Sequence, residues 1–362
     1  MTKKQHLVNI TLAVVMLIIL VLFFFRGYIW NTEKNKIKTK RLSTYLEITP
    51  VSNESLILCN NGIIIEAEGV NIRARGMEGK ILWSLKLENN ISDIFSCGSD
   101  LIIITDKKNI VTIDSSGKKL WQYEMPIKPS NILNDDKEFL IIQYNWPEHN
   151  IFEVFSTKGI KACTGIIDKS HIMSFCASPG NCFTISLLDI SSDKVLSKVA
   201  TYNTKGEILW ANNYKNILVP KVWNGSKDTV IVGGENFIKK FKLNGKLVKE
   251  LTFTDTVTKM AISNSLIIVV SKNNTFYDIN SYDMNFKQLG TLAVLNKPKG
   301  IFAGNDEYII YDKDNLLLSN TQGKIIAIYE SNIDINDAYI DDDRSIYIIS
   351  NRKLIKLSQV KR

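Results

Sequence analysis

From residue 42 onward, short apolar runs alternate with clusters of Gly, Asn, Asp and Ser. Residues 93–125 are representative, because the runs DIFSC, DLIIIT, NIVTID and KKLWQYEM are separated by GS, DKK and SSG. Apolar runs of this length, bounded by residues that favour turns, are typical of β-strands. We therefore expect an all-β domain in which four short antiparallel strands follow one another in each segment.

The segments repeat with a period of about 40 residues, which is marked by glycines in equivalent turns. These glycines are Gly79, Gly117, Gly159, Gly206, Gly245 and Gly323. The last interval is twice as long as the others, and a turn of the same kind without glycine is expected near Asn285, in SYDMNFKQLG. Four strands in each repeat of this length predict a β-propeller blade.

The repeat divides the chain into seven complete units and a shorter last one. The complete units are 57–87, 93–125, 131–167, 172–214, 217–253, 257–295 and 298–330. The last unit, with AYIDDD, SIYIIS and KLIKLSQ, supplies three strands, and RLSTYLEIT at 41–49 can supply the fourth. Pairing the first strand with the last unit would close the ring and leave no free sheet edge. We expect an eight-bladed propeller, with seven blades as the alternative.

Three of the turns share a second feature, a tryptophan four residues after the glycine. Gly79 precedes Trp83, Gly117 precedes Trp121 and Gly206 precedes Trp210. The glycine permits the positive φ of a tight turn into the outermost strand. We expect the indole to pack between neighbouring blades, where its N–H can reach a carbonyl group.

At GKILWSLKL (79–87), GKKLWQYEM (117–125) and GEILWANNY (206–214), the chain resembles the PQQ-like repeat propellers. These include quinoprotein dehydrogenases, non-enzymatic relatives such as the outer-membrane assembly lipoprotein, and uncharacterised membrane-anchored bacterial proteins. The resemblance implies a propeller over 42–362. The enzymatic branch carries two adjacent cysteines and an acidic calcium site, and no two of the five cysteines here are adjacent. We therefore expect the non-enzymatic branch, without a cofactor.

Before the repeats lies a stretch from Leu7 to Phe25 without a charged residue. These nineteen residues, of which only Asn9 and Thr11 are polar, are enough to cross a bilayer as a helix. A cleaved signal peptide is the alternative, but FFFRGYIWN lacks a small-x-small cleavage pattern. We expect a short tail at 1–6, a transmembrane anchor at 7–25 that binds the lipid bilayer, and a basic linker at 26–41.

The net charge of +8 is concentrated in the first 41 residues, which hold eight basic residues and one acidic residue. The repeats are nearly neutral, so nucleic acid is not an expected partner. The linker can meet anionic lipid headgroups or remain solvated. Basic residues after the anchor favour a cytoplasmic domain, but large domains translocate largely regardless of flanking charge. We expect a single-pass protein with an extracytoplasmic propeller, the alternative being a cytoplasmic one.

Residues for catalysis or metal binding are scarce. Histidine occurs at positions 6, 149 and 171 alone. His171 with Cys176 and Cys182 could bind a soft metal, but a structural role for these residues is favoured. In an exported protein, Cys176 and Cys182 could form a disulfide. The acidic run at 334–343 lacks the pattern of an EF-hand loop, and its residues Asp341, Asp342 and Asp343 are expected in a solvated turn between inner strands. We expect no enzyme activity and no metal site.

Surface recognition is the remaining function. In a propeller, the loop between the second and third strands of each blade shares one face with the inter-blade loops. NWPEHN, 145–150, is such a loop, and Trp146, Glu148 and His149 resemble a contact patch, unless Trp146 packs against its own blade. Trp223 is expected on the opposite face. The sequence predicts a scaffold that binds a protein or cell-envelope partner; the alternative is a sensor or carbohydrate-binding module with its ligand in the central channel.

Overall fold

The computed structural model describes residues 40–359 except for short gaps. The gaps are 49–54, 61, 77–78, 107, 136–138, 179–180, 190, 192–193, 226–227, 342–343 and 351–352. The anchor and linker expected at 7–25 and 26–41 therefore lie almost entirely outside the described residues. Within the described part of the chain, no helix is long and apolar enough to span a membrane.

All regular elements of the described residues are strands, and most belong to four-stranded antiparallel sheets. The first three sheets are β2 (Leu56–Asn60), β3 (Ile63–Glu68), β4 (Asn71–Arg75) and β5 (Ile81–Lys86); β6 (Ile91–Cys97), β7 (Asp100–Thr105), β8 (Asn109–Ile113) and β9 (Lys119–Glu124); and β10 (Asn131–Asn134), β11 (Phe139–Asn145), β12 (Asn150–Ser156) and β13 (Lys161–Ile166). The next three are β14 (Ser170–Ser178), β15 (Cys182–Asp189), β16 (Leu196–Asn203) and β17 (Ile208–Lys215); β18 (Lys221–Asn224), β19 (Thr229–Gly233), β20 (Phe237–Lys242) and β21 (Leu247–Thr252); and β22 (Val257–Ile262), β23 (Leu266–Asn273), β24 (Phe276–Asp283) and β25 (Gln288–Val294).

The remaining strands form one eight-stranded sheet that joins the two ends of the repeat region. Its strands are β26 (Gly300–Ala303), β27 (Glu307–Tyr311), β28 (Asn315–Asn320), β29 (Ile325–Glu330), β30 (Asp337–Ile340), β31 (Ile346–Ser350), β32 (Lys353–Gln359) and β1 (Lys40–Ile48). β1 lies between β29 and β32 and pairs antiparallel with β32, with Leu42 opposite Gln359. The first strand therefore closes the ring against the last one.

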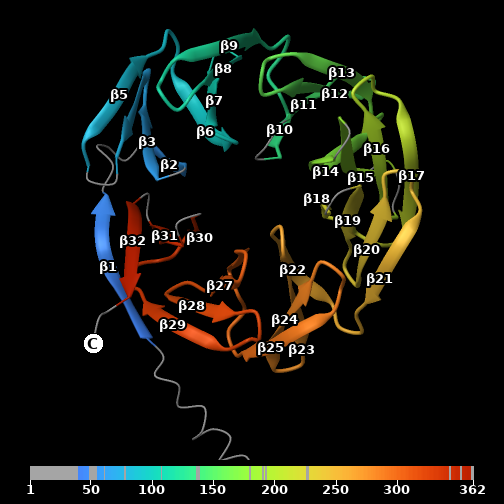
Figure 1. The fold of residues 1–362 in the computed structure, drawn as a ribbon. Coiled ribbons are helices and arrows are strands. Elements are labelled where there is room, and N and C mark those ends of the chain that lie inside the picture. Colours follow the sequence, from blue (N-terminus) through green and yellow to red (C-terminus); the bar gives the residue numbers. More distant parts are fainter. Residues whose placement is uncertain are drawn as a thin grey trace, which may run out of the picture. The chain divides into compact units, whose positions relative to one another are not determined.

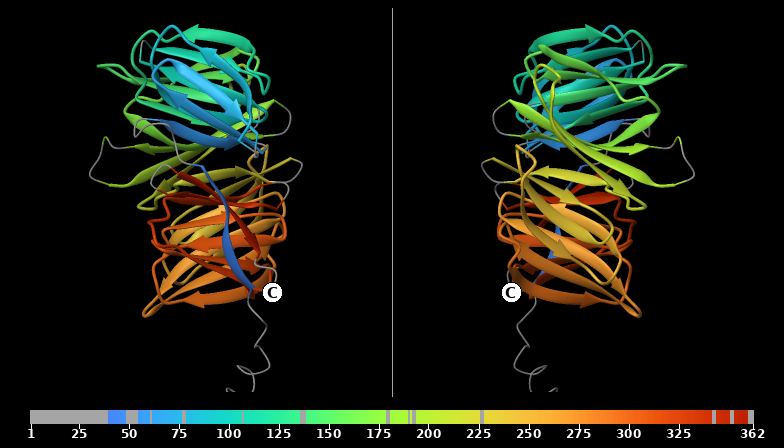
Figure 2. Two further views of the ribbon diagram at one scale, coloured as in Figure 1. Left: turned by 90° about the vertical axis from the view of Figure 1, so that its left-hand side faces the viewer. Right: turned by 90° about the vertical axis from the view of Figure 1, so that its right-hand side faces the viewer.

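The sheets of residues 42–362 stand side by side around a central opening, as in a β-propeller (Figures 1 and 2). The first strand of each sheet, such as β6 or β22, lies nearest the opening, and the fourth, such as β9 or β25, lies on the outside. The second strands are the most buried because both of their faces are covered; Leu101–Ile103 and Leu266–Val270 are almost inaccessible. Apolar clusters fill the spaces between adjacent sheets, for example Ile65 and Ala74 against Ile103 and Val111.

The turn into each outermost strand has one geometry. Gly117 has φ +87°, and its amide donates a hydrogen bond of 3.0 Å to the carbonyl of Asp114. The Asp114 carboxylate accepts hydrogen bonds from the amides of Ser116 and Lys118, both of 2.9 Å. A β-bulge follows on the outer strand, and it leaves Leu120 on the outer wall while Trp121 turns inward.

The tryptophans after these bulges contact the turn of the next sheet. A Cβ atom added to Gly117 would lie 2.7 Å from the Trp83 indole, and one added to Gly159 would lie 2.6 Å from the Trp121 indole. The Trp83 N–H donates to the Ser115 carbonyl at 2.8 Å. The glycine therefore serves two purposes, because it permits the positive φ and leaves room for the ring.

The same arrangement recurs with variations farther along the chain. Trp121 Nε1 donates to the Thr157 carbonyl at 2.6 Å. Trp210 lies against Gly245, but its buried N–H has no hydrogen-bond partner among the described residues. The turn without glycine is completed by Phe286, which has φ +61° and donates its amide to the Asp283 carbonyl at 2.9 Å. This position is one residue after the one expected from the sequence, Asn285.

Candidate functional site

Two sets of loops meet at one end of the sheets, and we call them together the loop face. One set joins the second and third strands of each sheet, and the other joins each sheet to the next. Backbone hydrogen bonds tie the two sets together, for instance from the Asp106 amide to the Asn90 carbonyl at 2.9 Å and from the Ile335 amide to the Lys313 carbonyl at 2.6 Å. Hydrogen bonds therefore connect the two sets of loops across the loop face.

Trp146, Glu148 and His149 lie together in the turn between β11 and β12, on the loop face. The Trp146 amide donates to the His149 carbonyl at 3.1 Å, which closes the turn. The Trp146 side chain is 40% exposed, Glu148 is exposed and His149 is half-buried. The indole is therefore partly exposed and available to a partner.

Buried polar groups hold the base of this turn. Asn150, at the start of β12, donates its side-chain amide to the Ser170 carbonyl at 3.0 Å and its backbone amide to the Asp168 carbonyl. The neighbouring Gln143 accepts from the Ile172 amide at 3.0 Å and lies 3.3 Å from Nδ1 of His171. These contacts join the β10–β13 and β14–β17 sheets directly beneath the exposed indole.

Trp223 lies elsewhere, on the innermost strand β18. It contributes to the lining of a central cavity of about 770 Å³, to which the first strands of several sheets contribute. The two tryptophans therefore do not form one site.

The central cavity has both aromatic and charged lining residues, and the lining includes Phe175, Trp223, Phe302, Asp135, Asp306 and Arg344. Most of these charges have partners within the protein. Asp306 forms an ion pair of 3.1 Å with Arg344, and the Asp135 carboxylate accepts the amides of Phe139 and Ala177, each at 3.0 Å. Asp135 is therefore committed to internal contacts, whereas the Asp306–Arg344 pair is largely exposed to solvent.

The cysteines and histidines do not assemble a metal site in the part of the chain that is described. Cys176 lies opposite Thr184 and Cys182 opposite Ser178, so the two cysteines are not a directly facing pair, and none of the five forms a disulfide. The disulfide considered from the sequence is therefore wrong. Burial raises the pKa of the Cys163 thiol to about 11, against the smaller effect of Lys161. Such a thiol is a poor nucleophile.

The family model of a family of unknown function, DUF5711, matches residues 153–358, more than half of the chain. The chain belongs to this family. The match begins in β12 and ends in β32, so it covers the later sheets of the ring. No curated protein matches the sequence.

Several solved structures are similar to the DUF5711 chain over most of its length, all at low identity. BamB from Moraxella catarrhalis is 16% identical, and the match covers 89% of this chain and 98% of that one with a TM-score of 0.58. Sqt1 of Saccharomyces cerevisiae is 10% identical, over 88% and 100%, with a TM-score of 0.58. The computationally designed Ika8 protein is 11% identical, over 86% and 98%, with a TM-score of 0.58. At these identities the likeness establishes the fold alone, a β-propeller.

The sequence pointed to the loop at 145–150 but missed the lysines that gather elsewhere on the loop face. Lys259, Lys297, Lys299 and Lys313 line one hollow, although they come from three segments of the chain. No spacing in the sequence signals this arrangement, because it depends on how two adjacent sheets are packed.

Proposed function

We propose that the protein is a membrane-tethered, non-enzymatic scaffold that binds a protein or cell-envelope partner through its loop face. In this proposal, residues 7–25 anchor the chain in the bilayer, 26–41 form a basic linker, and 42–362 form an extracytoplasmic propeller of the PQQ-like type. Support for the anchor comes from the uncharged apolar stretch from Leu7 to Phe25.

We further propose that the propeller has eight blades. The eight-stranded sheet can be divided into β26–β29 and a second group in which β30–β32 are completed by β1. Each group then repeats the four-stranded order of the other six sheets. A strand from the start of the chain, paired with β32, completes the last group and joins the two ends of the domain.

The exposed indole of Trp146 is the observation that carries the proposed function. A tryptophan that is 40% exposed leaves much of a large apolar ring in water, whereas Trp83, Trp121 and Trp210 pack against neighbouring sheets. Tryptophan is among the residues that contribute most to binding at protein interfaces. The turn that presents it is short and its base is fixed by Asn150, so little conformational entropy would be lost on binding.

Photo-crosslinking in intact cells tests this function. A photoreactive amino acid replaces Glu148 in the full chain. In the matched control it replaces Lys205, an exposed residue in the turn between β16 and β17, at the end of the β14–β17 sheet that is opposite to the loop face. We expect a discrete adduct from position 148 and none from position 205. Equal labelling from both positions, or no adduct from position 148, would contradict the proposal.

A second candidate, a small ligand in the central cavity, is favoured by the cavity's volume of about 770 Å³ and by its aromatic lining. Since Asp135 is already engaged by two backbone amides, such a ligand would depend mainly on Trp223 and Phe302 and on the exposed Asp306–Arg344 pair. Quenching of tryptophan fluorescence by a panel of soluble sugars, lost in Trp223→Phe and retained in Trp146→Phe, would support this candidate. If no sugar of the panel quenches the fluorescence, the central cavity is rejected as a carbohydrate-binding site.

A further inference from the structure

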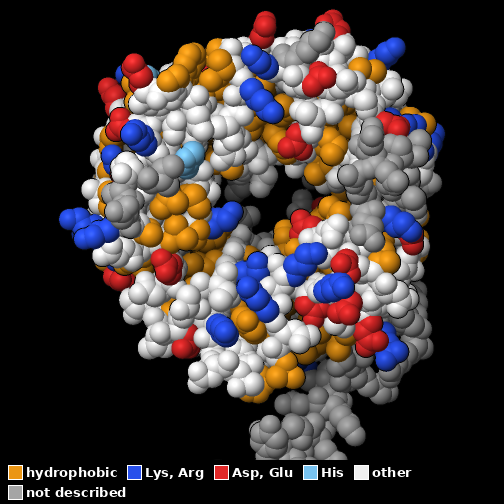
Figure 3. All heavy atoms as spheres, turned by 180° about the vertical axis from the view of Figure 1, so that it is seen from behind, with side chains coloured by type: hydrophobic (Ala, Val, Ile, Leu, Met, Phe, Trp, Pro, Cys, Tyr) orange, Lys and Arg blue, Asp and Glu red, His pale blue; other side chains and the backbone are white. Residues whose placement is uncertain are grey.

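A hollow of about 530 Å³ opens on the loop face between the sheets β22–β25 and β26–β29. Three separate segments supply its charged lining: Lys259 from the innermost strand β22, Lys297 and Lys299 from the loop before β26, and Asp312, Lys313 and Asp314 from the turn between β27 and β28. Basic side chains gather beside the central opening on this face (Figure 3).

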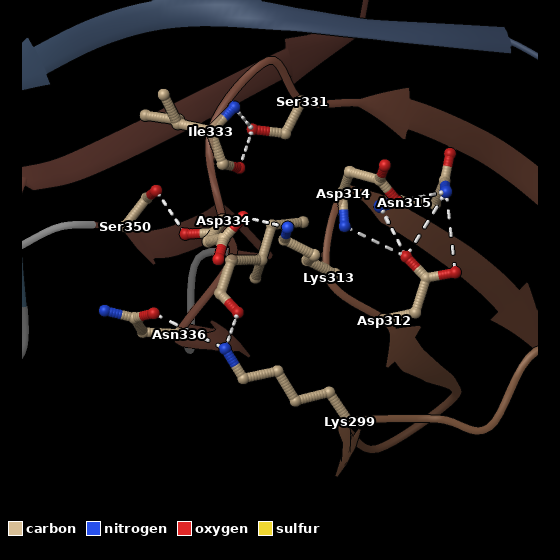
Figure 4. Close-up of polar contacts among 11 residues, drawn as sticks. Lys299, Asp312, Lys313, Asp314, Asn315, Ser331, Ile333, Asp334, Asn336 and Ser350 are labelled. Atoms are coloured by element: carbon tan, nitrogen blue, oxygen red, sulfur yellow. Dashed lines mark hydrogen bonds and ion pairs between the residues drawn. The ribbon is translucent and has the colours of Figure 1, made fainter.

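Two carboxylates line the hollow, Asp312 and Asp314. Asp314 is exposed and accepts a hydrogen bond of 2.8 Å from the Asn315 side chain, and Asp312 is occupied by the turn itself. Asp312 accepts hydrogen bonds from the Asn315 amide at 2.7 Å and the Asp314 amide at 3.0 Å (Figure 4). It also accepts one from the Asn296 side chain at 3.1 Å. Although burial opposes it, these donors hold the pKa of Asp312 below its usual value. The carboxylate therefore stabilises the turn and the adjoining loop and has little capacity left for the lysines.

Two of the lysines are held by the chain without losing their charge. Lys299 donates to the carbonyl of Ile335 and to the Asn336 side chain, and both of these acceptors are neutral (Figure 4). Lys313 lies 3.4 Å from Asp334, and both side chains are largely exposed, so solvent weakens this pair. The ammonium groups of Lys299 and Lys313 therefore remain available to an anionic partner.

The other two lysines have no internal partner. The ammonium groups of Lys259 and Lys297 form no hydrogen bond or ion pair with another described residue, although the main chain of Lys259 pairs with Val270 in the sheet. Lys259 is a half-buried residue of strand β22, whereas Lys297 is an exposed residue of the loop before β26. A lysine without a counter-ion in the lining of a hollow favours the arrival of a negative charge.

The loop that carries Lys297 and Lys299 also carries an exposed apolar residue. Leu295 is 69% exposed and stands two residues before Lys297, and the buried Pro298 fixes the loop between the two lysines. Lys259 belongs to a strand and not to a loop, so a flat bilayer surface would reach Lys297 more readily than Lys259. A peptide can place carboxylates in the hollow and an apolar side chain against Leu295.

We propose that this hollow binds an acidic segment of a partner protein, one that carries Asp or Glu side chains next to an apolar residue. The inference rests on the proposed function and deepens it, because it states the chemistry of the partner that the loop face recognises. Lys259 and Lys297 supply unpaired charge, Lys299 and Lys313 extend the basic surface, and Leu295 supplies the apolar contact.

The test measures fluorescence anisotropy of a labelled peptide of ten glutamates and two leucines with the full-length chain. The same peptide with glutamine for glutamate is the control ligand. The variant is Lys259→Gln/Lys297→Gln, and the matched control is Lys128→Gln/Lys169→Gln, which removes two exposed charges from other inter-sheet loops of the same face. We expect the variant to weaken binding by about tenfold, the control by less than about twofold, and 0.3 M salt to weaken wild-type binding strongly.

The inference would be overturned if the glutamate peptide did not bind the wild type, or if the glutamine peptide bound equally well. Equal effects of the two double variants would also overturn it. Full competition by 5 mM inorganic phosphate would overturn it as well, because it would indicate a site for small anions. Binding to vesicles with 30% anionic lipid that is lost in Lys259→Gln/Lys297→Gln, without peptide binding, would overturn it in favour of a membrane contact. If the peptide does not bind but the crosslinked adduct at position 148 forms in cells, the proposed function stands and only this inference fails. If that adduct does not form, the proposed function itself fails.

Discussion

The contact between each tryptophan and the next turn makes a sharp prediction about Gly117→Ala. In the wild type, Gly117 has φ +87° and the Trp83 ring lies where a Cβ atom would be, at 2.7 Å. Alanine at this position must displace the ring and weaken its 2.8 Å hydrogen bond to the Ser115 carbonyl. The substitution therefore combines backbone strain with the loss of an inter-sheet contact.

Gly79→Ala is the matched control, because Gly79 has φ +82° but no atom within 4 Å of an added Cβ. In both variants an alanine must adopt the left-handed conformation, which lowers the free energy of unfolding by about 1–2 kcal/mol. The lower entropy of the unfolded chain raises it again by about 0.4–1 kcal/mol. Overpacking and the weakened hydrogen bond affect Gly117→Ala alone and add about 1–3 kcal/mol. We expect Gly117→Ala to be the less stable variant by this amount.

Guanidinium unfolding of the two variants, followed by far-ultraviolet circular dichroism and tryptophan fluorescence, measures this difference. The midpoint should fall in the order wild type, Gly79→Ala, Gly117→Ala, with the larger step between the two variants. Equal midpoints for the variants would refute the assignment of Trp83 to the turn at Gly117.

Three further predictions concern single groups. Trp121→Phe keeps an aromatic ring but loses the hydrogen bond to Thr157, so it should lower the free energy of unfolding by about 1 kcal/mol in chemical denaturation. Because no cysteine forms a disulfide, iodoacetamide should alkylate all five after unfolding without a reductant. Because burial raises the pKa of the Cys163 thiol, this residue should react slowly in the native protein at pH 8. Mass spectrometry of the alkylated protein checks both predictions. Burial and the contact with Glu153 raise the pKa of Tyr123 to about 12. The contribution of Tyr123 to stability is therefore fully present below pH 10 and is lost as the pH rises towards 12. In thermal melts, Tyr123→Phe should lose less stability than the wild type over this pH range.

Much of the architecture follows from local signals in the sequence. The glycine turns fix where each outermost strand begins, and the tryptophan four residues later lies against the next turn because strand pairing and the bulge have fixed directions. Phe286 shows the limit of this reasoning, since a phenylalanine with positive φ occupies a position where glycine would have been expected. The chain accepts it because the Asp283 carboxylate organises that turn through the amides of Asn285 and Lys287, each at 2.8 Å.

The candidate binding surface was predictable in part. Trp146, Glu148 and His149 are adjacent in sequence, so a single turn brings them together. Lys259 and Lys313 are separated by more than 50 residues and meet because neighbouring sheets pack side by side. The buried Glu153, which accepts from Tyr123 and Tyr144 and pairs with Lys161, was likewise invisible in the sequence, because its partners come from several strands.

The central claim, that the loop face binds a partner through Trp146, is tested most directly by the adduct from position 148 in a Trp146→Ala background. We expect the adduct formed in cells to fall at least fivefold in this background while the amount of folded protein is unchanged, since tryptophan anchors contribute about 2 kcal/mol or more to an interface. A yield that stays the same without the indole would contradict the account.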